Sequence, residues 1–70
     1  MTALAKNIAR LLAANAKAGK QPNCPYRLHL MSGASPASIG RILDGGRYRD
    51  DTLAKLATAL GVTPAELLAE

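Results

Sequence analysis

Aromatic residues are scarce in this sequence, which has no tryptophan, no phenylalanine and only two tyrosines. A hydrophobic core therefore has to be built from Leu, Ile, Val and Ala, side chains that are commonly buried between helices. No stretch approaches the ~18 consecutive apolar residues of a membrane span. Lys6, Asn7 and Arg10 interrupt the apolar residues near the amino terminus, so a signal peptide does not fit either. We therefore expect a cytoplasmic chain that folds as one small domain, residues 1–70.

Cysteine and histidine occur once each, as Cys24 and His29. A lone cysteine cannot form an internal disulfide, and a metal site on this pair would need further ligands that only acidic residues could supply. A Cys–His nucleophile would also need a third partner and oxyanion donors, which the sequence does not offer in any evident place. We expect no enzymatic activity, no metal, no cofactor and no small-molecule substrate.

Acidic residues are almost missing from the first two thirds of the chain. Residues 1–49 hold eight Lys or Arg and a single acid, Asp44, whereas residues 50–70 hold four acids and one lysine. The net charge of +4 is therefore unevenly distributed along the sequence. Lys and Arg near phosphates release condensed counterions, so this distribution favours a polyanionic partner. Solubility alone would explain the same charge, and both interpretations stay open at this point.

Apolar residues recur at helical spacing along the chain, and no run is typical of a strand. The expected helices cover about residues 3–17, 25–32, 36–44, 51–60 and 64–69. The residues expected to face the core from the first two helices are Leu4, Ile8, Leu11, Leu12, Leu28 and Met31, with Leu30 beside them. Five short helices predict an all-α fold in the form of a compact bundle.

The third helix has clear start and stop signals in the sequence. Ser35 is expected to cap the free amides, and Pro36 stands at the first helical position, where its missing N–H does no harm. Ala34 and Ile39 are spaced for a hydrophobic staple. The pair Gly45–Gly46 is expected to end the helix.

The outer face of this third helix carries little bulk. Ile39, Ile42 and Leu43 are expected to point into the core. The opposite side carries Ala37, Gly40, Arg41 and Asp44. A glycine inside a helix costs ~0.5–1 kcal/mol relative to alanine, so Gly40 needs a reason. Close packing against a neighbouring helix and close approach of a ligand are the two alternatives.

The remaining helices begin and end with further signals. Gly33 allows one tight turn between the second and third helices, which then form a helix-turn-helix unit. Asp50 or Asp51 is expected to cap the fourth helix. Thr63 and Glu66 form a capping box at the start of the fifth.

The run GASPASIGRILDGG, followed by DDTLAKLATALGVTPAELL, resembles the Cro/phage-repressor (XRE-type) helix-turn-helix family. The resemblance covers roughly Leu28 to Leu68. Its most specific parts are Ser38–Ile39, Arg41–Ile42, Gly45 and the pattern from Leu53 to Leu68. It implies a lambda-repressor-like DNA-binding domain whose recognition helix, residues 35–43, enters the major groove while the second helix lies across the DNA backbone.

The resemblance also implies which residues contact DNA. Those expected at base edges are Pro36, Ala37, Ser38, Gly40 and Arg41. Those expected at backbone phosphates are Tyr26, Arg27, Ser35, Arg47, Tyr48 and Arg49. The chemistry agrees with this division, since Ala37 offers an apolar contact to a thymine methyl and Arg41 can reach O6 and N7 of guanine. Arginines in the loop position the protein without reading sequence.

Three positions depart from the family pattern. Pro25 stands where many members have a phosphate-binding glutamine, so that contact is either absent or replaced by Tyr26 or Arg27. Asp44 stands where members often have asparagine, and phosphate would repel it. His29 stands where a small alanine usually packs against the recognition helix.

Three functions remain to be compared. The first is a sequence-specific double-stranded DNA-binding regulator, a repressor of bacterial or phage/prophage type, acting as a homodimer on a symmetric operator in the nucleoid. The second is a helix-turn-helix module that binds a protein, as in an antitoxin or antirepressor, and the weak hydrogen-bonding capacity of the third helix favours it. The third, a membrane-surface role for the basic first helix, is disfavoured by the scarcity of aromatic residues. The chain also fits the amino-terminal domain of a longer regulator.

Overall fold

The computed structural model describes residues 2–70, and every regular element within that range is an α-helix. The helices are α1 (Ala3–Ala18), α2 (Pro25–Ser32), α3 (Pro36–Leu43), α4 (Asp50–Leu60) and α5 (Pro64–Leu68). The all-α bundle expected from the sequence is confirmed. Four of the helices differ from the expected bounds by one residue at one end. None of the five is long and apolar enough to cross a membrane.

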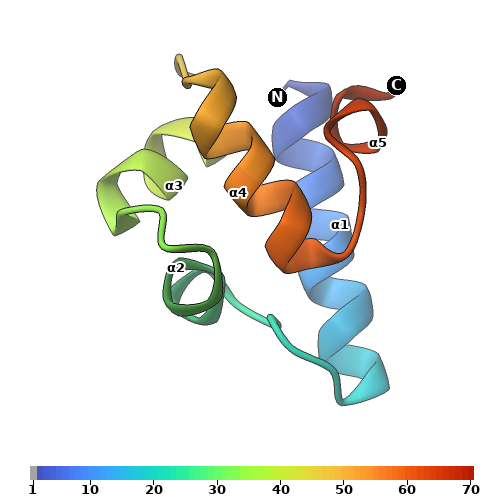
Figure 1. Ribbon diagram of the computed structural model, residues 1–70. Coiled ribbons are helices and arrows are strands. Elements are labelled where there is room, and N and C mark those ends of the chain that lie inside the picture. Colours follow the sequence, from blue (N-terminus) through green and yellow to red (C-terminus); the bar gives the residue numbers. More distant parts are fainter. Residues whose placement is uncertain (1) are drawn as a thin grey trace.

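The helices are arranged around α4, which contacts α2 on one side and α5 on the other. In Figure 1, α2 and α3 form the left side of the molecule, while α1 and α5 lie together on the right. α1 also contacts α3 behind α4. This arrangement leaves one long side of α3 facing away from the rest of the bundle.

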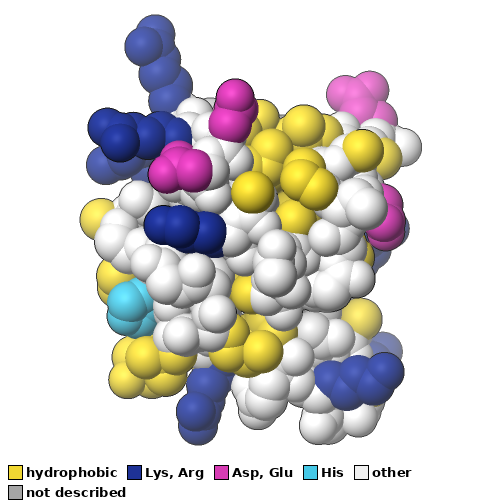
Figure 2. All heavy atoms as spheres, in the orientation of Figure 1, with side chains coloured by type: hydrophobic (Ala, Val, Ile, Leu, Met, Phe, Trp, Pro, Cys, Tyr) yellow, Lys and Arg dark blue, Asp and Glu magenta, His cyan; other side chains and the backbone are white. Residues whose placement is uncertain are grey.

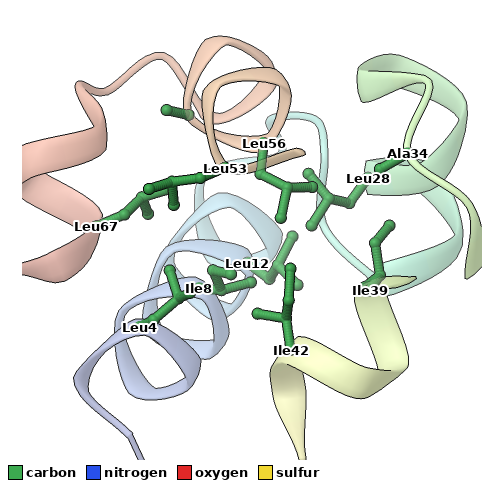
Figure 3. Close-up of a cluster of buried hydrophobic side chains, with 11 residues drawn as sticks. Leu4, Ile8, Leu12, Leu28, Ala34, Ile39, Ile42, Leu53, Leu56 and Leu67 are labelled. Carbon is green, nitrogen blue, oxygen red and sulfur yellow. The ribbon is translucent and has the colours of Figure 1, made fainter. Parts of the chain in front are cut away.

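The core is a single cluster of aliphatic side chains to which each helix contributes (Figure 3). Its larger members are Leu4, Ile8, Leu12, Leu28, Ile39, Ile42, Leu53, Leu56 and Leu67. Full burial of one such side chain stabilises the fold by ~1.5–3 kcal/mol. The cluster therefore replaces the aromatic residues that the sequence lacks.

The helix starts combine side-chain caps and prolines. Oγ1 of Thr2 accepts a hydrogen bond from the amide of Ala5 at 3.1 Å and begins α1. At α5, Thr63 and Glu66 form the expected capping box. The expectation that Asp50 or Asp51 caps α4 is wrong. Arg49 is the last residue with extended backbone, so Asp50 already lies within the helix.

The exposed side of α2 is more apolar than the sequence predicted. Leu28 is the only residue of this helix that is buried. Met31 and Leu30, which were expected to face the core, are each 51 % exposed. The eight-residue helix turns only one narrow edge toward α4 and α3, and Leu28 alone occupies it.

Two asparagines on α1 hold segments that are distant along the chain. Nδ2 of Asn15 donates to the carbonyl of Pro22 at 2.9 Å and fixes the connection between α1 and α2. Nδ2 of Asn7 donates to the carbonyls of Leu67 and Ala69 at 2.8 and 2.7 Å. Asn7 is 9 % exposed, and it pairs carbonyl groups at the end of α5 that the helix itself leaves free.

The Asn7 contact predicts a stability change. Asn7→Ala leaves buried carbonyl groups at the end of α5 without donors, and we expect the free energy of unfolding to fall by ~1–3 kcal/mol. Chemical denaturation measures this loss, and amide exchange at residues 65–68 should quicken at the same time. Lys6→Ala, an exposed change on the same helix, is the matched control and should stay within ~0.5 kcal/mol. Equal stability of the two variants would contradict the prediction.

Candidate nucleic-acid interface

The turn between α2 and α3 is held by three local contacts. Gly33 has a φ of 78°, and its amide donates to the carbonyl of His29 at 3.0 Å. Nδ1 of His29 lies 2.6 Å from the carbonyl oxygen of Ala34. A carbonyl can only accept, so Nδ1 carries the proton in this contact. His29 thus ties α2 to the turn, and Ala34 is buried beneath it.

The start of α3 depends on two serines. Oγ of Ser35 accepts from the amide of Ser38 at 3.1 Å, as the sequence predicted. The Ser35 hydroxyl also donates to Oγ of Ser38 at 2.9 Å. One hydroxyl hydrogen of the pair thus bonds within the protein, and the other is free to donate outward.

The end of α3 is closed by a tight turn of two glycines. Gly45 has a φ of 85°, and its amide donates to the carbonyl of Ile42 at 3.0 Å. The amide of Gly46 donates to the carbonyl of Arg41 at 2.8 Å. Together these bonds form a Schellman motif, which satisfies carbonyl groups at the carboxyl end of the helix.

Gly46 is required for a different reason from Gly45. Its φ is not in the left-handed region, so the backbone itself would accept an alanine. A Cβ at this position would lie 2.7 Å from Cγ of Arg41 and 3.0 Å from the carbonyl oxygen of Arg41. The aliphatic part of Arg41 therefore passes directly over Gly46, and the glycine determines the path of that side chain.

The outward side of α3 is a ridge of exposed residues. Ile39 and Ile42 are buried, and Leu43 is half-buried against the same core. The exposed residues of the helix are Pro36, Ala37, Gly40 and Arg41, and Asp44, which ends it, is also exposed. A hollow flanks this ridge on each side.

The first hollow is basic and polar. Its volume is about 330 Å³, and it is lined by Ser38, Arg41, Ile42, Arg47, Tyr48, Arg49 and Thr52. Three arginines thus border one space between α3 and the loop that precedes α4. Figure 2 shows Lys and Arg side chains gathered at the upper left, beside acidic side chains. Such a space suits phosphate oxygens or the acceptor atoms of a base.

The second hollow is apolar and lies toward the start of α2. Its volume is about 220 Å³, and it is lined by Pro25, Tyr26, Pro36, Ile39, Gly40 and Leu43. A Cβ added at Gly40 would have no atom of the described residues within 4 Å. The packing explanation for Gly40 is therefore wrong for the isolated chain, because α2 borders the same hollow but none of its described atoms would contact that Cβ.

The residues expected from the sequence divide between these places. Ser38, Arg41, Arg47, Tyr48 and Arg49 meet at the basic hollow. Tyr26, Pro36 and Gly40 meet at the apolar hollow. Arg27, Ser35 and Ala37 line neither, although all three are exposed.

Some lining residues were not expected from the sequence. Thr52 borders the basic hollow from the first turn of α4, and Pro25 and Leu43 border the apolar one. The sequence offered one signal for Thr52: it is a polar residue three positions after Arg49, close to the expected phosphate contacts. Leu43 was assigned to the core, which its half-burial only partly supports.

The model of one protein family matches residues 25–69, and that family is described as the Cro/C1-type HTH DNA-binding domain. The matched segment runs from the first residue of α2 to the residue after α5, so it includes both hollows and the ridge between them. No curated protein and no solved structure matches the chain.

Alanine substitutions at Gly46 and at Gly40 should change the stability of the fold in opposite directions. Gly46→Ala should destabilise the wild type more than it destabilises an Arg41→Ala background, because the added Cβ meets Cγ of Arg41. We expect a coupling energy of about 1 kcal/mol from the double-mutant cycle, measured by chemical denaturation. Gly40→Ala is the control in open space and should raise stability by ~0.5–1 kcal/mol. Strict additivity of Gly46→Ala and Arg41→Ala would contradict the assigned path of the arginine.

Proposed function

Because the chain belongs to the Cro/C1-type HTH DNA-binding domain family, we propose that it is a sequence-specific regulator of transcription that binds double-stranded DNA. More narrowly, it acts as a repressor of bacterial or phage/prophage type. Residues 1–70 form its DNA-binding domain, and it works in the cytoplasm on the nucleoid. The observation that carries the proposal is the ridge of α3, whose short side chains stand beside a hollow bordered by three arginines.

In this proposal α3, with its cap at Ser35, lies in the major groove, and Arg41 is the main reader of bases. Its guanidinium is the long donor group on the ridge and can bond O6 and N7 of one guanine. Ser38 adds a hydroxyl hydrogen that is not used inside the protein. Pro36, Ala37 and Gly40 are short enough to let the helix backbone approach the base edges.

The residues proposed for the DNA backbone lie on both sides of α3. Arg47, Tyr48 and Arg49 reach phosphates from the loop before α4, and Tyr26 and Arg27 reach them from α2. All five are exposed. These contacts hold the register of the complex but carry no sequence information.

Ser35 is the weakest of the proposed phosphate ligands. A phosphodiester oxygen can only accept a hydrogen bond, and the Ser35 hydroxyl is already engaged with the amide and the hydroxyl of Ser38. A direct contact to phosphate would compete with these bonds. Ser35 therefore contributes mainly by capping the recognition helix.

We also propose that two copies bind one symmetric operator. Half-sites one helical turn apart have centres ~34–36 Å from each other. The chain measures 30 × 25 × 19 Å, so two copies fit side by side at this spacing. No small-molecule substrate or cofactor enters this function.

A protein-interaction function, of antitoxin or antirepressor type, is the second candidate. The exposed apolar side chains of Leu30 and Met31 on α2 favour it. Next to them lies a third hollow, lined by Met31, Ser32, Ala54, Lys55, Thr58 and Ala59. In this case affinity for duplex DNA would be weak and independent of sequence at physiological salt.

Selection of bound duplexes from a random pool tests the proposed function, and Arg41 gives the sharpest variant. The wild type should select one symmetric motif. Arg41→Ala should lose the preference for one base pair per half-site and weaken binding to the selected site by ~1–3 kcal/mol. Arg41→Lys keeps the charge but not the two-pronged donor, so it should lose the same preference. Equal losses on every duplex for both variants would overturn the role of Arg41.

Arg47 should behave differently from Arg41. Arg47→Ala removes a phosphate contact, so we expect weaker binding to all sequences and a salt dependence that is flatter by about one unit of log–log slope. Lys55→Ala is the matched control, since Lys55 lines the hollow between α2 and α4. Titrations at several salt concentrations measure both slopes. An unchanged slope for Arg47→Ala, or an equal change for Lys55→Ala, would contradict the assignment.

A further inference from the structure

The contacts proposed above place no group of the DNA in the apolar hollow beside α3. We infer that the hollow bordered by Tyr26, Pro36 and Gly40 receives the C5-methyl group of a thymine, which makes it a second site of base discrimination besides Arg41. The inference rests on the proposed function, because it needs α3 to lie in the major groove.

The lining of the hollow excludes phosphate as its occupant. Among the described residues, its lining consists of Pro25, Tyr26, Pro36, Ile39, Gly40 and Leu43 and includes no charged side chain. Proline has no N–H to donate. Only the Tyr26 hydroxyl is a polar side-chain group here, whereas the basic hollow on the other side of α3 is lined by three arginines. Phosphates therefore favour the basic hollow.

The position of the hollow makes it accessible from the DNA. Pro36, Gly40 and Leu43 follow one another at helical spacing, so the hollow runs along the side of α3. Ile39, which is 2 % exposed, forms the part nearest the core. Tyr26 is 64 % exposed and forms the opposite wall from α2. An object that reaches the ridge of α3 from outside meets the hollow directly.

Gly40 keeps the hollow open. No atom of the described part of the chain lies within 4 Å of a Cβ built at this residue. A glycine inside a helix is unfavourable relative to alanine, and packing within the chain does not account for it. Two explanations were open for Gly40, close packing against a helix and close approach of a ligand. The second remains, so the glycine leaves space for an incoming group.

The major groove presents one strongly apolar group, the C5-methyl of thymine. Cytosine lacks this methyl group, so an apolar hollow at the groove wall distinguishes A·T from G·C pairs at that position. The hollow of about 220 Å³ has room for the methyl and the adjoining edge of the pyrimidine ring. Ala37 also faces outward but does not line the hollow, so its contact to a methyl would be a separate one.

Replacement of each thymine in the selected site by deoxyuridine, one at a time, tests the inference because it removes only the methyl group. The full chain and the duplexes are titrated at one fixed salt concentration. For the wild type we expect one thymine per half-site at which loss of the methyl weakens binding about fourfold, the effect of burying one such group. At that thymine the effect should fall below about twofold in Gly40→Ala, which places a methyl at the mouth of the hollow, and in Tyr26→Ala, which removes a wall.

Tyr26→Phe is the matched control. It keeps the ring that forms the wall and removes only the hydroxyl, so the methyl effect should stay about fourfold. Gly40 and Tyr26 lie outside the buried core, and thermal unfolding of each variant verifies that it is folded.

The outcomes separate this inference from the proposed function. If the wild type selects no sequence, the proposed function fails and the inference fails with it. If the wild type selects a site but no thymine shows a methyl effect, only the inference is overturned. The same holds if a methyl effect appears and is equal in the wild type, Gly40→Ala and Tyr26→Ala, since the methyl would then lie elsewhere. Uniform weakening of all duplexes by Gly40→Ala, with no methyl effect, would point to deoxyribose in the hollow and would also overturn it.

Discussion

The burial of Ile39 and Ile42 is the interaction on which the whole interface depends. These two side chains, 2 % and 1 % exposed, attach α3 to α1 and to the rest of the core (Figure 3). Their positions in a helix of eight residues determine which side of it faces outward. Rotation of α3 by one residue would bury Gly40 or Arg41 and remove both hollows. The core therefore sets the recognition surface as well as the stability of the fold.

Three glycines around α3 serve three different purposes. Gly45 supplies a left-handed turn residue that ends the helix. Gly46 leaves space for the aliphatic part of Arg41, and Gly40 borders open space, which we infer receives a thymine methyl group. A helix this short gains little stability from its own hydrogen bonds, so its ends must be well capped. Ser35 at one end and the Gly45 turn at the other provide these caps and so allow a destabilising glycine in the middle.

The sequence predicted most of the fold because the signals involved are local. Helical spacing, the caps at Ser35 and Thr63 and the glycine turns depend on residues a few positions apart. The role of Asn7 could not be predicted, because its partners lie about 60 positions away in the sequence. The exposure of Met31 was missed for a similar reason, since helical spacing does not tell how much of a short helix its neighbours cover.

The sequence predicted most residues of the candidate site, but it could not show that they divide between a basic and an apolar hollow. This division affects how much charge can contribute to binding. The arginines are concentrated on one side of α3, where Asp50 and Asp51 begin the next helix and oppose phosphate. Each phosphate contact contributes a slope of only about −0.9 to the salt dependence, so one copy with a few arginines gains limited electrostatic affinity. On the other side of α3, Arg27 is the one arginine proposed to contact phosphate, and the hollow itself can add affinity only through apolar contact, which salt screens little. In the proposed function, specific binding by this domain would therefore depend on the fit of α3 in the groove and on the pairing of two copies more than on charge.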